Sequence, residues 1–544
     1  METVVSPVAR LWNLVREGKA DMTAIYFYAI ISGLIQLAVP LGIQAIIGFV
    51  LGGMLRASLI LLISVVVFAV MIAGITQMNQ MKIIEKIQQR IFVKVAYAYA
   101  DRIPKLDLKQ IDSFYLPELV NRFFDTVSLQ KSISKLLLDL PIAAMQIVFG
   151  LILLSFYHPV FIIFGLLLMV ILWLILFTTG SKGLESSMQE SRHKYALVSW
   201  LQEMARLIKT FKFSEGAALH LKKADEKTIS YLDARTQHFK ILLLQFRTLV
   251  FFKVLVTAAL MIGGVILLLN QLLNVGQFVA AEIIIITVIN SVEKIIVSLE
   301  TIYDALTSVV KIAKVTDKAV ETSGTYLMPG ATAPAIEAAK LSFCFYADKP
   351  VIKSVSFKIK QGEKVCIAGE EGSGKSTLLK LLTGVYKDFT GILLMNNVPL
   401  GNYDIKSLRS KTGIVFNHED IFHGSLWENI TMGKTNIDSD YINNLCSTVG
   451  LHPFLSSLSL GYDTELDPTG KRLARNVVQK ILLVRALADK PSLLLAEEPW
   501  QSIEEPYKTS IQQLLLQLDN TTVIIATNDK SFIEKCHQKI YLNN

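Results

Sequence analysis

The sequence predicts a membrane-embedded all-α region of six helices, followed by a cytosolic α/β domain that binds phosphate groups. Two observations lead to this fold class. Of the 544 residues, 52% are hydrophobic and only 18% are charged, whereas soluble domains carry about a quarter of their residues as charged ones. A glycine-rich run that ends in Lys-Ser-Thr at 375–377 stands in the C-terminal part. This composition excludes a disordered chain, a collagen-like repeat and a secreted disulfide scaffold.

Six apolar runs account for the hydrophobic excess. They lie near 24–50, 59–78, 136–157, 160–179, 249–269 and 278–299. Each is long enough to cross a hydrocarbon core of about 30 Å, which takes about 20 helical residues. The connections after the second and fourth runs are long and charged, and their helical pattern predicts helices that continue well outside the bilayer.

Positive charge in the long connections predicts the orientation of the chain. The first of them carries Lys82, Lys86, Arg90 and Lys94. Because cytoplasmic loops are enriched in Lys and Arg, both long connections, the N-terminus and the C-terminal domain are expected in the cytoplasm. The net charge of +8 is therefore interpreted as an orientation signal. No basic tract alternates with aromatic residues, so no nucleic-acid partner is expected. Membrane lipid is the expected surrounding partner.

Three polar residues of the sixth span, Glu282, Asn290 and Glu293, fall within an arc of roughly 80° on one helix face. Charged groups inside a membrane are costly and usually face a bundle interior or a water-filled path. Alternatively, Glu282 and Glu293 lie near the two interfaces and extend toward water. The sequence leaves both interpretations open.

The C-terminal domain begins after a linker. The helical pattern ends near Thr316, and a stretch rich in Gly, Pro, Ala and Thr follows at 324–334. From Ile336 onward, short β-branched runs alternate with amphipathic segments. We therefore divide the chain into a membrane domain at 1–316, a linker at 317–335 and an ATP-binding domain at 336–544.

A phosphate loop stands near the start of this domain. Its pattern, G-x-x-x-x-G-K-[ST], lies between an expected strand at 364–368 and an expected helix at 377–382. Backbone N–H groups of such a loop surround phosphate, Lys375 reaches the β/γ oxygens, and the Ser376 hydroxyl is placed for Mg²⁺. The expected cofactors are thus ATP and Mg²⁺, and the binding residues are Gly369, Glu370, Glu371, Gly372, Ser373, Gly374, Lys375, Ser376 and Thr377.

Together, six spans, two large cytoplasmic loops and a C-terminal phosphate loop resemble a half-transporter of the ABC exporter family. The run at 114–122 is similar to the family's first-loop motif, and Gly276-Gln277-Phe278-Val279-Ala280 resembles the entry to the sixth span in the bacterial toxin and peptide secretion branch. The resemblance implies an inner-membrane protein that pairs with a second ABC half, as a homodimer or a heterodimer, and works with a periplasmic adaptor. In such pairs each ATP lies between one chain's phosphate loop and the other's signature motif.

The resemblance also assigns roles around the phosphate loop. Asn417 stands where the family has the Gln that ligates Mg²⁺, and Glu497 where it has an Asp. Glu498 takes the place of the general base that activates water. Asn528 replaces the His that contacts the γ-phosphate in the switch region. The adenine-stacking aromatic is either Phe345 or Tyr346.

The signature motif departs furthest from the family. The family's Leu-Ser-Gly-Gly-Gln falls on Leu473, Ala474, Arg475, Asn476 and Val477. Ala474 removes a hydroxyl, while Arg475 and Asn476 add bulk where backbone must approach phosphate closely. With the phosphate loop kept, we expect ATP binding to persist and hydrolysis to be weakened.

These residues lead to one main function and two rivals. The main interpretation is an ATP-binding subunit of an exporter that moves a peptide, a protein or another amphipathic cargo out of the cytoplasm. A nucleotide-binding pseudoenzyme that regulates or scaffolds a secretion complex is the first alternative. A lipid flippase shares the architecture and is the second.

Overall fold

The computed structural model describes residues 6–16, 18–53, 56–111, 116–214, 218–330, 332–345, 350–417, 420–466 and 473–542. The chain divides into two compact units. The first comprises Met1–Lys105 and Ser113–Lys318, and the second Leu106–Asp112 and Ala319–Asn544. A short segment of the first long connection thus joins the second unit, where Leu106 forms an antiparallel bridge with Val320.

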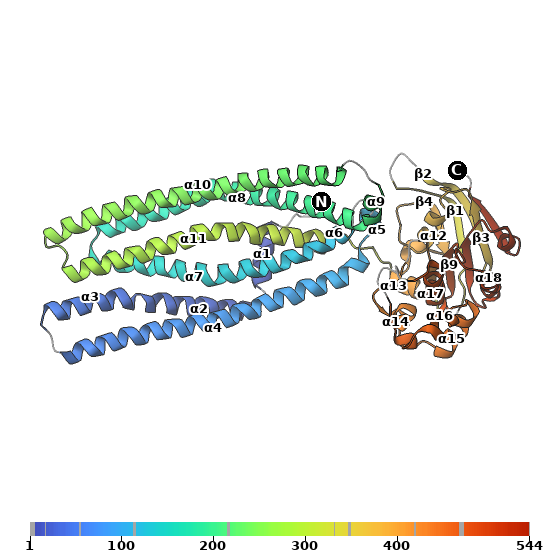
Figure 1. The fold of residues 1–544 in the computed structure, drawn as a ribbon, viewed down its shortest axis with the longest axis horizontal. Coiled ribbons are helices and arrows are strands. Elements are labelled where there is room, and N and C mark those ends of the chain that lie inside the picture. Colours follow the sequence, from blue (N-terminus) through green and yellow to red (C-terminus); the bar gives the residue numbers. More distant parts are fainter. Residues whose placement is uncertain are drawn as a thin grey trace. The chain divides into compact units, whose positions relative to one another are not determined.

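The described residues of the first unit form helices. Six of these helical stretches are long and apolar enough to cross a membrane, which confirms the predicted spans. The longest helices extend far beyond the apolar runs, as the charged connections predicted (Figure 1). The helices are α1 (Pro7–Arg16), α2 (Lys19–Gln36), α3 (Ala38–Leu51), α4 (Arg56–Arg102), α6 (Leu116–Asn121), α7 (Asp125–Tyr157), α8 (Val160–Arg206), α9 (Ile208–Phe213), α10 (Leu219–Leu269) and α11 (Val275–Thr316).

The first span differs from the single helix that was predicted. It is divided at Leu37 into α2 and α3, three residues before Pro40. Proline has no N–H, and its ring collides with the carbonyl four residues earlier, here that of Gln36. The helix therefore breaks where the proline removes a backbone hydrogen bond.

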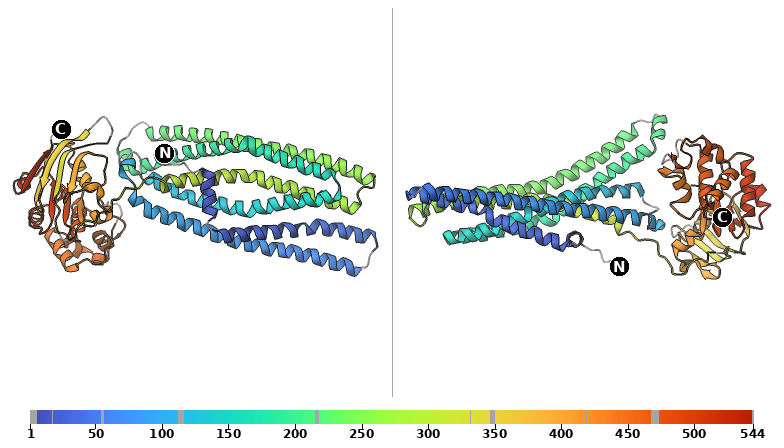
Figure 2. Two further views of the ribbon diagram at one scale, coloured as in Figure 1. Left: turned by 180° about the vertical axis from the view of Figure 1, so that it is seen from behind. Right: turned by 90° about the horizontal axis from the view of Figure 1, so that it is seen from below.

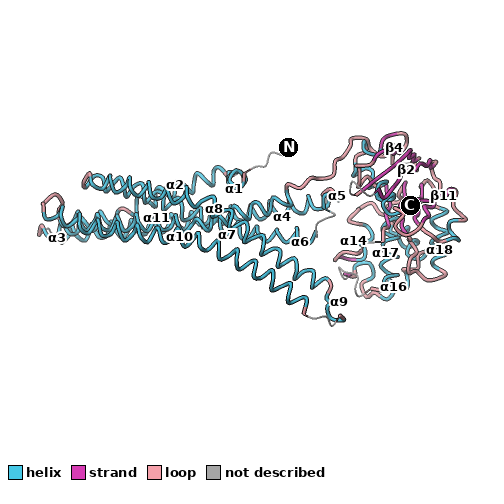
Figure 3. Tube along the Cα trace, turned by 90° about the horizontal axis from the view of Figure 1, so that it is seen from above, coloured by secondary structure: helices cyan, strands magenta, loops and turns pink. Residues whose placement is uncertain are grey.

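Pairs of helices build the bundle. α7 packs along α11, α8 along α10, and α2 along α4. Their core includes Leu154, Leu249, Ile284 and Val288, all of which are buried. Figure 2 and Figure 3 show α8 and α10 together diverging from the other helices toward α9.

The second unit is built on two main sheets in its described part. One is parallel, with the order β11-β3-β10-β9-β6, and the other is antiparallel, with the order β2-β1-β4-β5. The strands are β1 (Ile336–Cys344), β2 (Pro350–Ile359), β3 (Lys364–Gly369), β4 (Thr390–Met395), β5 (Val398–Pro399), β6 (Thr412–Val415), β9 (Leu493–Glu497), β10 (Thr522–Ala526) and β11 (Gln538–Leu542), and a small pair joins β7 (Gly424–Ser425) to β8 (Glu465–Leu466).

Helices flank these sheets. The phosphate-loop helix α12 follows β3 directly, and its observed position confirms the strand and helix predicted around the loop. The helices are α5 (Leu108–Ile111), α12 (Lys375–Leu382), α13 (Ile405–Ser410), α14 (Leu426–Thr431), α15 (Ser439–Thr448), α16 (His452–Ser457), α17 (Arg475–Leu487), α18 (Tyr507–Gln517) and α19 (Lys530–Ile533).

The parallel sheet determines where the site forms. β3, β10 and β9 are neighbours and run in the same direction, so their carboxyl ends meet at one edge. The phosphate loop follows β3, Glu497 ends β9 and Glu498 follows it, and Thr527 and Asn528 follow β10. Segments that are more than 150 residues apart in the chain are thereby brought to one place.

Candidate nucleotide-binding site

The phosphate loop has the backbone that its glycines permit. Gly372 and Gly374 have φ angles of +81° and +91°, in the region that residues with a Cβ rarely adopt. A Cβ on Gly374 would also lie 2.8 Å from the carbonyl oxygen of Val351. The loop leads directly into the N-terminus of α12, so backbone N–H groups and the positive end of the helix dipole face the same space.

Side chains of the loop hold it in this shape. The Lys375 ammonium donates hydrogen bonds to the carbonyl oxygens of Gly369 and Glu370, at 2.6 and 2.8 Å. The Ser376 hydroxyl donates a hydrogen bond to the Glu497 carboxylate. The hydroxyl oxygen of Ser373 is buried and has no partner among the described residues. Because buried polar groups are nearly always hydrogen-bonded, this atom indicates that the loop is shaped for a phosphate.

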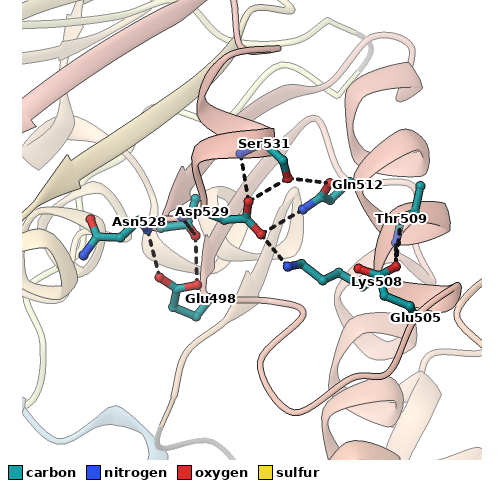
Figure 4. A network of polar contacts seen from close by, with 9 residues as sticks. Glu498, Glu505, Lys508, Thr509, Gln512, Asn528, Asp529 and Ser531 are labelled. Atoms are coloured by element: carbon teal, nitrogen blue, oxygen red, sulfur yellow. Dashed lines mark hydrogen bonds and ion pairs between the residues drawn. The ribbon is translucent and has the colours of Figure 1, made fainter.

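Glu498 is fixed to the loop that follows β10. Its carboxylate accepts hydrogen bonds from the Thr527 hydroxyl at 2.8 Å and from the backbone N–H of Asn528 at 3.1 Å (Figure 4). The side-chain oxygen of Asn528 in turn accepts a hydrogen bond from the N–H of Gly369, at 3.3 Å. Glu498 itself has a φ of +40°, a conformation that non-glycine residues adopt mainly where surrounding contacts enforce it.

Asp529 anchors the same loop to the neighbouring helix. It accepts hydrogen bonds from Lys508 at 2.7 Å, from Gln512 at 3.2 Å and from the N–H of Ser531 at 3.0 Å (Figure 4). Burial by itself would raise the pKa of Asp529, but the hydrogen bonds from Lys508 and Ser531 outweigh it and lower the pKa to about 2. The carboxylate is therefore charged at neutral pH, and its hydrogen bonds hold α18 and α19 together next to Asn528.

One cavity of about 580 Å³ is lined by most of the predicted residues. Its lining contains the acidic, amide and hydroxyl groups from the three strand ends and the phosphate loop. The predicted residues that line it are Glu371, Gly372, Gly374, Lys375, Ser376, Thr377, Asn417, Glu497, Glu498 and Asn528.

Other predicted residues lie elsewhere. Gly369, Glu370 and Ser373 belong to the loop but do not line the cavity, and neither does the run Leu473–Val477. The ring of Phe345 packs edge-on against Phe343 and Tyr386, on the surface of the domain core. Tyr346 lies outside the described residues, so the choice of stacking aromatic remains a prediction.

Three oxygen-bearing side chains could hold a divalent cation. Ser376, Glu497 and Asn417 all line the cavity and offer hydroxyl, carboxylate and amide oxygens. Mg²⁺ prefers such ligands and is usually bound by few protein groups together with phosphate and water. The donor set therefore fits Mg²⁺ bound with a nucleotide.

Two residues of this site were not among the predicted ones. Thr527 bonds Glu498 through its hydroxyl, and its place directly after a strand end was a usable signal. Gln501 also lines the cavity, and it lies in the run 500–504, which by resemblance stands where the family has its D-loop.

The signature positions make specific contacts within their own domain. Arg475, the first residue of α17, donates a hydrogen bond to the carbonyl oxygen of Asn417 at 3.0 Å. Asn476 donates to Glu504 at 3.2 Å. Lys480, one turn further along α17, donates to the other oxygen of Glu504 at 2.7 Å. The start of α17 is thus tied both to the Asn417 segment and to the loop after β9.

The buried Lys480 makes the Glu504 contact important for stability. The Lys480 side chain is 4% exposed and that of Glu504 is 48% exposed. Hydrogen bonds from Lys480, from the backbone and from Asn476 lower the pKa of Glu504 to about 2. An unfolded Glu has a pKa of about 4.3, so this carboxylate stabilises the folded domain above pH of about 4.3, and the contribution is lost as pH falls toward 2.

We therefore expect Glu504→Gln to lower the stability of the ATP-binding domain at pH 7 by about 1–2 kcal/mol, because a buried ammonium loses its charged partner. The half-exposed carboxylate keeps this effect below that of a fully buried pair. The measurement is the midpoint of the domain's unfolding transition between pH 7 and pH 3. The difference in unfolding midpoint between wild type and Glu504→Gln should become smaller below about pH 4. Lys434→Met, which breaks an exposed pair with Asp489, is the control and should change little; a gap that widens in acid would contradict the assignment.

Comparisons with known proteins agree with this geometry. The family description "ABC transporter transmembrane region" matches residues 22–292, and "ABC transporter" matches residues 352–501. A bacterial Atm1-family ABC exporter, solved with ATP bound, superposes with a TM-score of 0.85 over 96% of this chain and 93% of that one, at 16% sequence identity.

Curated relatives match over shorter stretches. A Mycoplasma genitalium protein named an ABC transporter ATP-binding protein is 28% identical over 279 residues, which is 51% of this chain and 46% of the relative. A multidrug efflux ATP-binding/permease protein of Mycobacterium bovis is 29% identical over 199 residues, or 36% of this chain and 17% of the relative. The matched segments cover less than half of either relative. With both family descriptions matched and the exporter architecture reproduced along the chain, this protein belongs to the ABC transporter family and has the fold of an exporter half-transporter.

Proposed function

We propose that the chain is the ATP-binding half of a dimeric exporter whose hydrolysis is weakened. The observation that carries this proposal is the single cavity in which Lys375, Ser376, Glu497 and Glu498 meet, while Asn528 occupies the switch position. The first four supply the charges and oxygens that binding and hydrolysis of ATP require. The fifth offers an amide where the family has an imidazole.

Each residue has a defined task in this proposal. The phosphate loop and Lys375 bind the phosphates, and Ser376, Glu497 and Asn417 hold the cation. Glu498 accepts a proton from the attacking water, because it is the carboxylate fixed at the strand end by Thr527 and Asn528. When bound, ATP supplies the phosphoanhydride bond, and Mg²⁺ offsets its negative charge.

Weakened hydrolysis follows from the altered positions. Removing one group that stabilises developing charge costs about 10²–10³ in rate, and several such losses do not add. Asn528 cannot carry charge, and Arg475 and Asn476 are already engaged with Asn417 and Glu504 within their own domain.

The proposed cargo is a peptide, a protein or another amphipathic molecule, exported from the cytoplasm of a bacterial cell. The charged extensions of the helices and the N-terminus lie on the cytoplasmic side, in keeping with the positive charge of the long connections. A second ABC half completes the dimer, and a periplasmic adaptor is the further partner that the resemblance implies. The phosphate loop is intact while the motifs around it are altered, and this combination also favours the non-hydrolysing pseudoenzyme as the second candidate. A lipid flippase is the third.

Restoring the switch residue separates the first two candidates. We expect the reconstituted chain to bind ATP and hydrolyse it slowly, and Asn528→His to raise steady-state turnover about tenfold, because one lost donor of several is returned. The measurement is phosphate release in proteoliposomes, with ATP affinity determined in parallel. Clear ATP binding without turnover in either protein would overturn the exporter proposal in favour of the pseudoenzyme.

A further inference from the structure

One face of helix α17 donates hydrogen bonds to the backbone beside the nucleotide cavity. Arg475 and Gln479 are four residues apart and therefore lie on the same face of this helix. The Arg475 guanidinium donates to the carbonyl oxygen of Asn417 at 3.0 Å. The Gln479 amide donates to the carbonyl oxygen of Pro499 at 3.2 Å. Asn417 lines the cavity, and Pro499 directly follows the cavity residue Glu498, so this face of α17 holds two of the segments that form the site.

The same helix also holds the chain a few residues after Asn417. Asp420 is the next described residue, and its carbonyl oxygen accepts a hydrogen bond from Arg485 at 3.2 Å. Arg485 lies about 15 Å beyond Arg475 along α17. The helix that carries both arginines is anchored in the domain core by Val478, Ile481 and Leu482, which are at most 2% exposed. α17 is therefore a firm support for both contacts.

Asn417 depends on its backbone more than the other two residues that could hold the cation. Ser376 and Glu497 fix each other through a hydrogen bond between their side chains. Among the described residues, no hydrogen bond fixes the side-chain amide of Asn417. The direction of this amide is therefore determined by the backbone from which it extends, and Arg475 bonds the carbonyl group of that backbone.

The contact between Arg475 and Asn417 depends on an altered position of the signature motif. By resemblance, the family has a glycine where this chain has Arg475. A glycine has no side chain and could not make this hydrogen bond. The family's signature serves the nucleotide of the opposite chain, whereas Arg475 contacts a residue that lines the cavity of its own domain.

We propose that Arg475 is a positioning residue for the cation site of its own chain. It holds the Asn417 backbone and so keeps the Asn417 amide oxygen available to the cation, together with Ser376 and Glu497. The proposal rests on the proposed nucleotide-binding function and gives the altered signature position a task within its own domain. Loss of the guanidinium then weakens the part of nucleotide binding that needs the cation and leaves the remaining part intact.

The cation dependence of nucleotide binding tests the proposal. The affinity of the full chain in lipid nanodiscs for a fluorescent ATP analogue is measured once with Mg²⁺ and once with a chelator, and the ratio of the two affinities is the gain from the cation. Arg475→Met keeps a long side chain with good helix propensity but removes the donor. The gain should fall about fivefold, less than for a direct charged contact, because the effect passes through the backbone. Affinity in chelator should be unchanged, and Arg475→Lys, which retains a donor, should keep most of the gain.

A second substitution tests whether Arg475 acts through Asn417. Asn417→Ala should itself lower the gain from Mg²⁺, and Arg475→Met should lower it no further in that background, because both substitutions then affect the same ligand. Lys490→Met removes a positive charge just beyond the end of α17 and breaks an exposed pair with Asp438, so it is the matched control and should keep the full gain. A wild-type gain in Arg475→Met, or an equal further loss in the Asn417→Ala background, would overturn the proposal.

Hydrogen exchange without nucleotide keeps the two proposals apart. The backbone amides of Phe416 and Asn417 should exchange about fivefold faster in Arg475→Met, because their segment loses its contact with α17. Unchanged exchange in the phosphate loop establishes that the variant is folded. Equal exchange at Phe416 and Asn417 in wild type and Arg475→Met would overturn the positioning role, whether or not nucleotide binds. Faster exchange in a chain that binds no nucleotide supports the Arg475 contact and counts against the proposed ATP-driven function alone.

Discussion

Lys375→Met is expected to reduce ATP affinity about 100-fold, because the variant loses the one ammonium among the described residues that line the nucleotide cavity. Hydrogen bonds to charged groups contribute about 1.5–3 kcal/mol each, and each 1.4 kcal/mol is a factor of ten in affinity. In the structure, Lys375 holds the carbonyl oxygens of Gly369 and Glu370, so the substitution also releases two contacts that shape the loop. Binding of a fluorescent ATP analogue to the reconstituted chain measures the effect.

Lys380→Met is the matched control for this experiment. Lys380 belongs to the same helix, in its last turn, and does not line the cavity. The Lys380→Met substitution removes the same charge from α12, but at the end of the helix that is distant from the phosphate loop. ATP affinity that falls equally in both variants would mean that the charge of the helix, and not the position of Lys375, governs binding.

The sequence was a reliable guide wherever one segment carries the whole signal. Each span is indicated by a continuous apolar run, and the structure has helices at those places. The phosphate loop is indicated by a spaced motif, and the structure has a strand–loop–helix unit there. The apolar run at 24–50 predicted a single helix because its hydrophobic pattern continues through Pro40, whereas this proline removes a backbone hydrogen bond to Gln36 and divides the helix at Leu37.

Contacts between distant segments were the harder part to predict. Nothing near Glu498 in the chain indicates that Thr527 will donate to it, since the register of β9 against β10 brings them together. The same reason explains why Lys253 was not recognised as the partner of Glu293 and why Glu504 was not linked to Lys480. Side chains paired across elements depend on packing, which a local pattern does not encode.

Glu498→Gln is expected to reduce the remaining ATP turnover by about 10²–10³ while leaving ATP affinity nearly unchanged. A positioned general base contributes about 10²–10⁴ to rate, and Glu498 is the carboxylate held at the strand end by Thr527 and by the N–H of Asn528. The amide of Gln keeps an oxygen for the Asn528 N–H, and its NH₂ can donate to the Thr527 hydroxyl, so the loop is expected to keep its shape.

ATP turnover and ATP affinity must be measured together. Loss of a general base lowers turnover alone, whereas loss of a structural residue lowers both turnover and affinity. Glu505→Gln is the matched control, because Glu505 bonds Thr509 on α18 and does not line the cavity. The control should hydrolyse ATP at the wild-type rate. Equal turnover in Glu498→Gln and wild type would remove Glu498 from the role of base. The other carboxylates among the described cavity residues are Glu371 and Glu497, and such a result would make these two the next candidates for the activation of water.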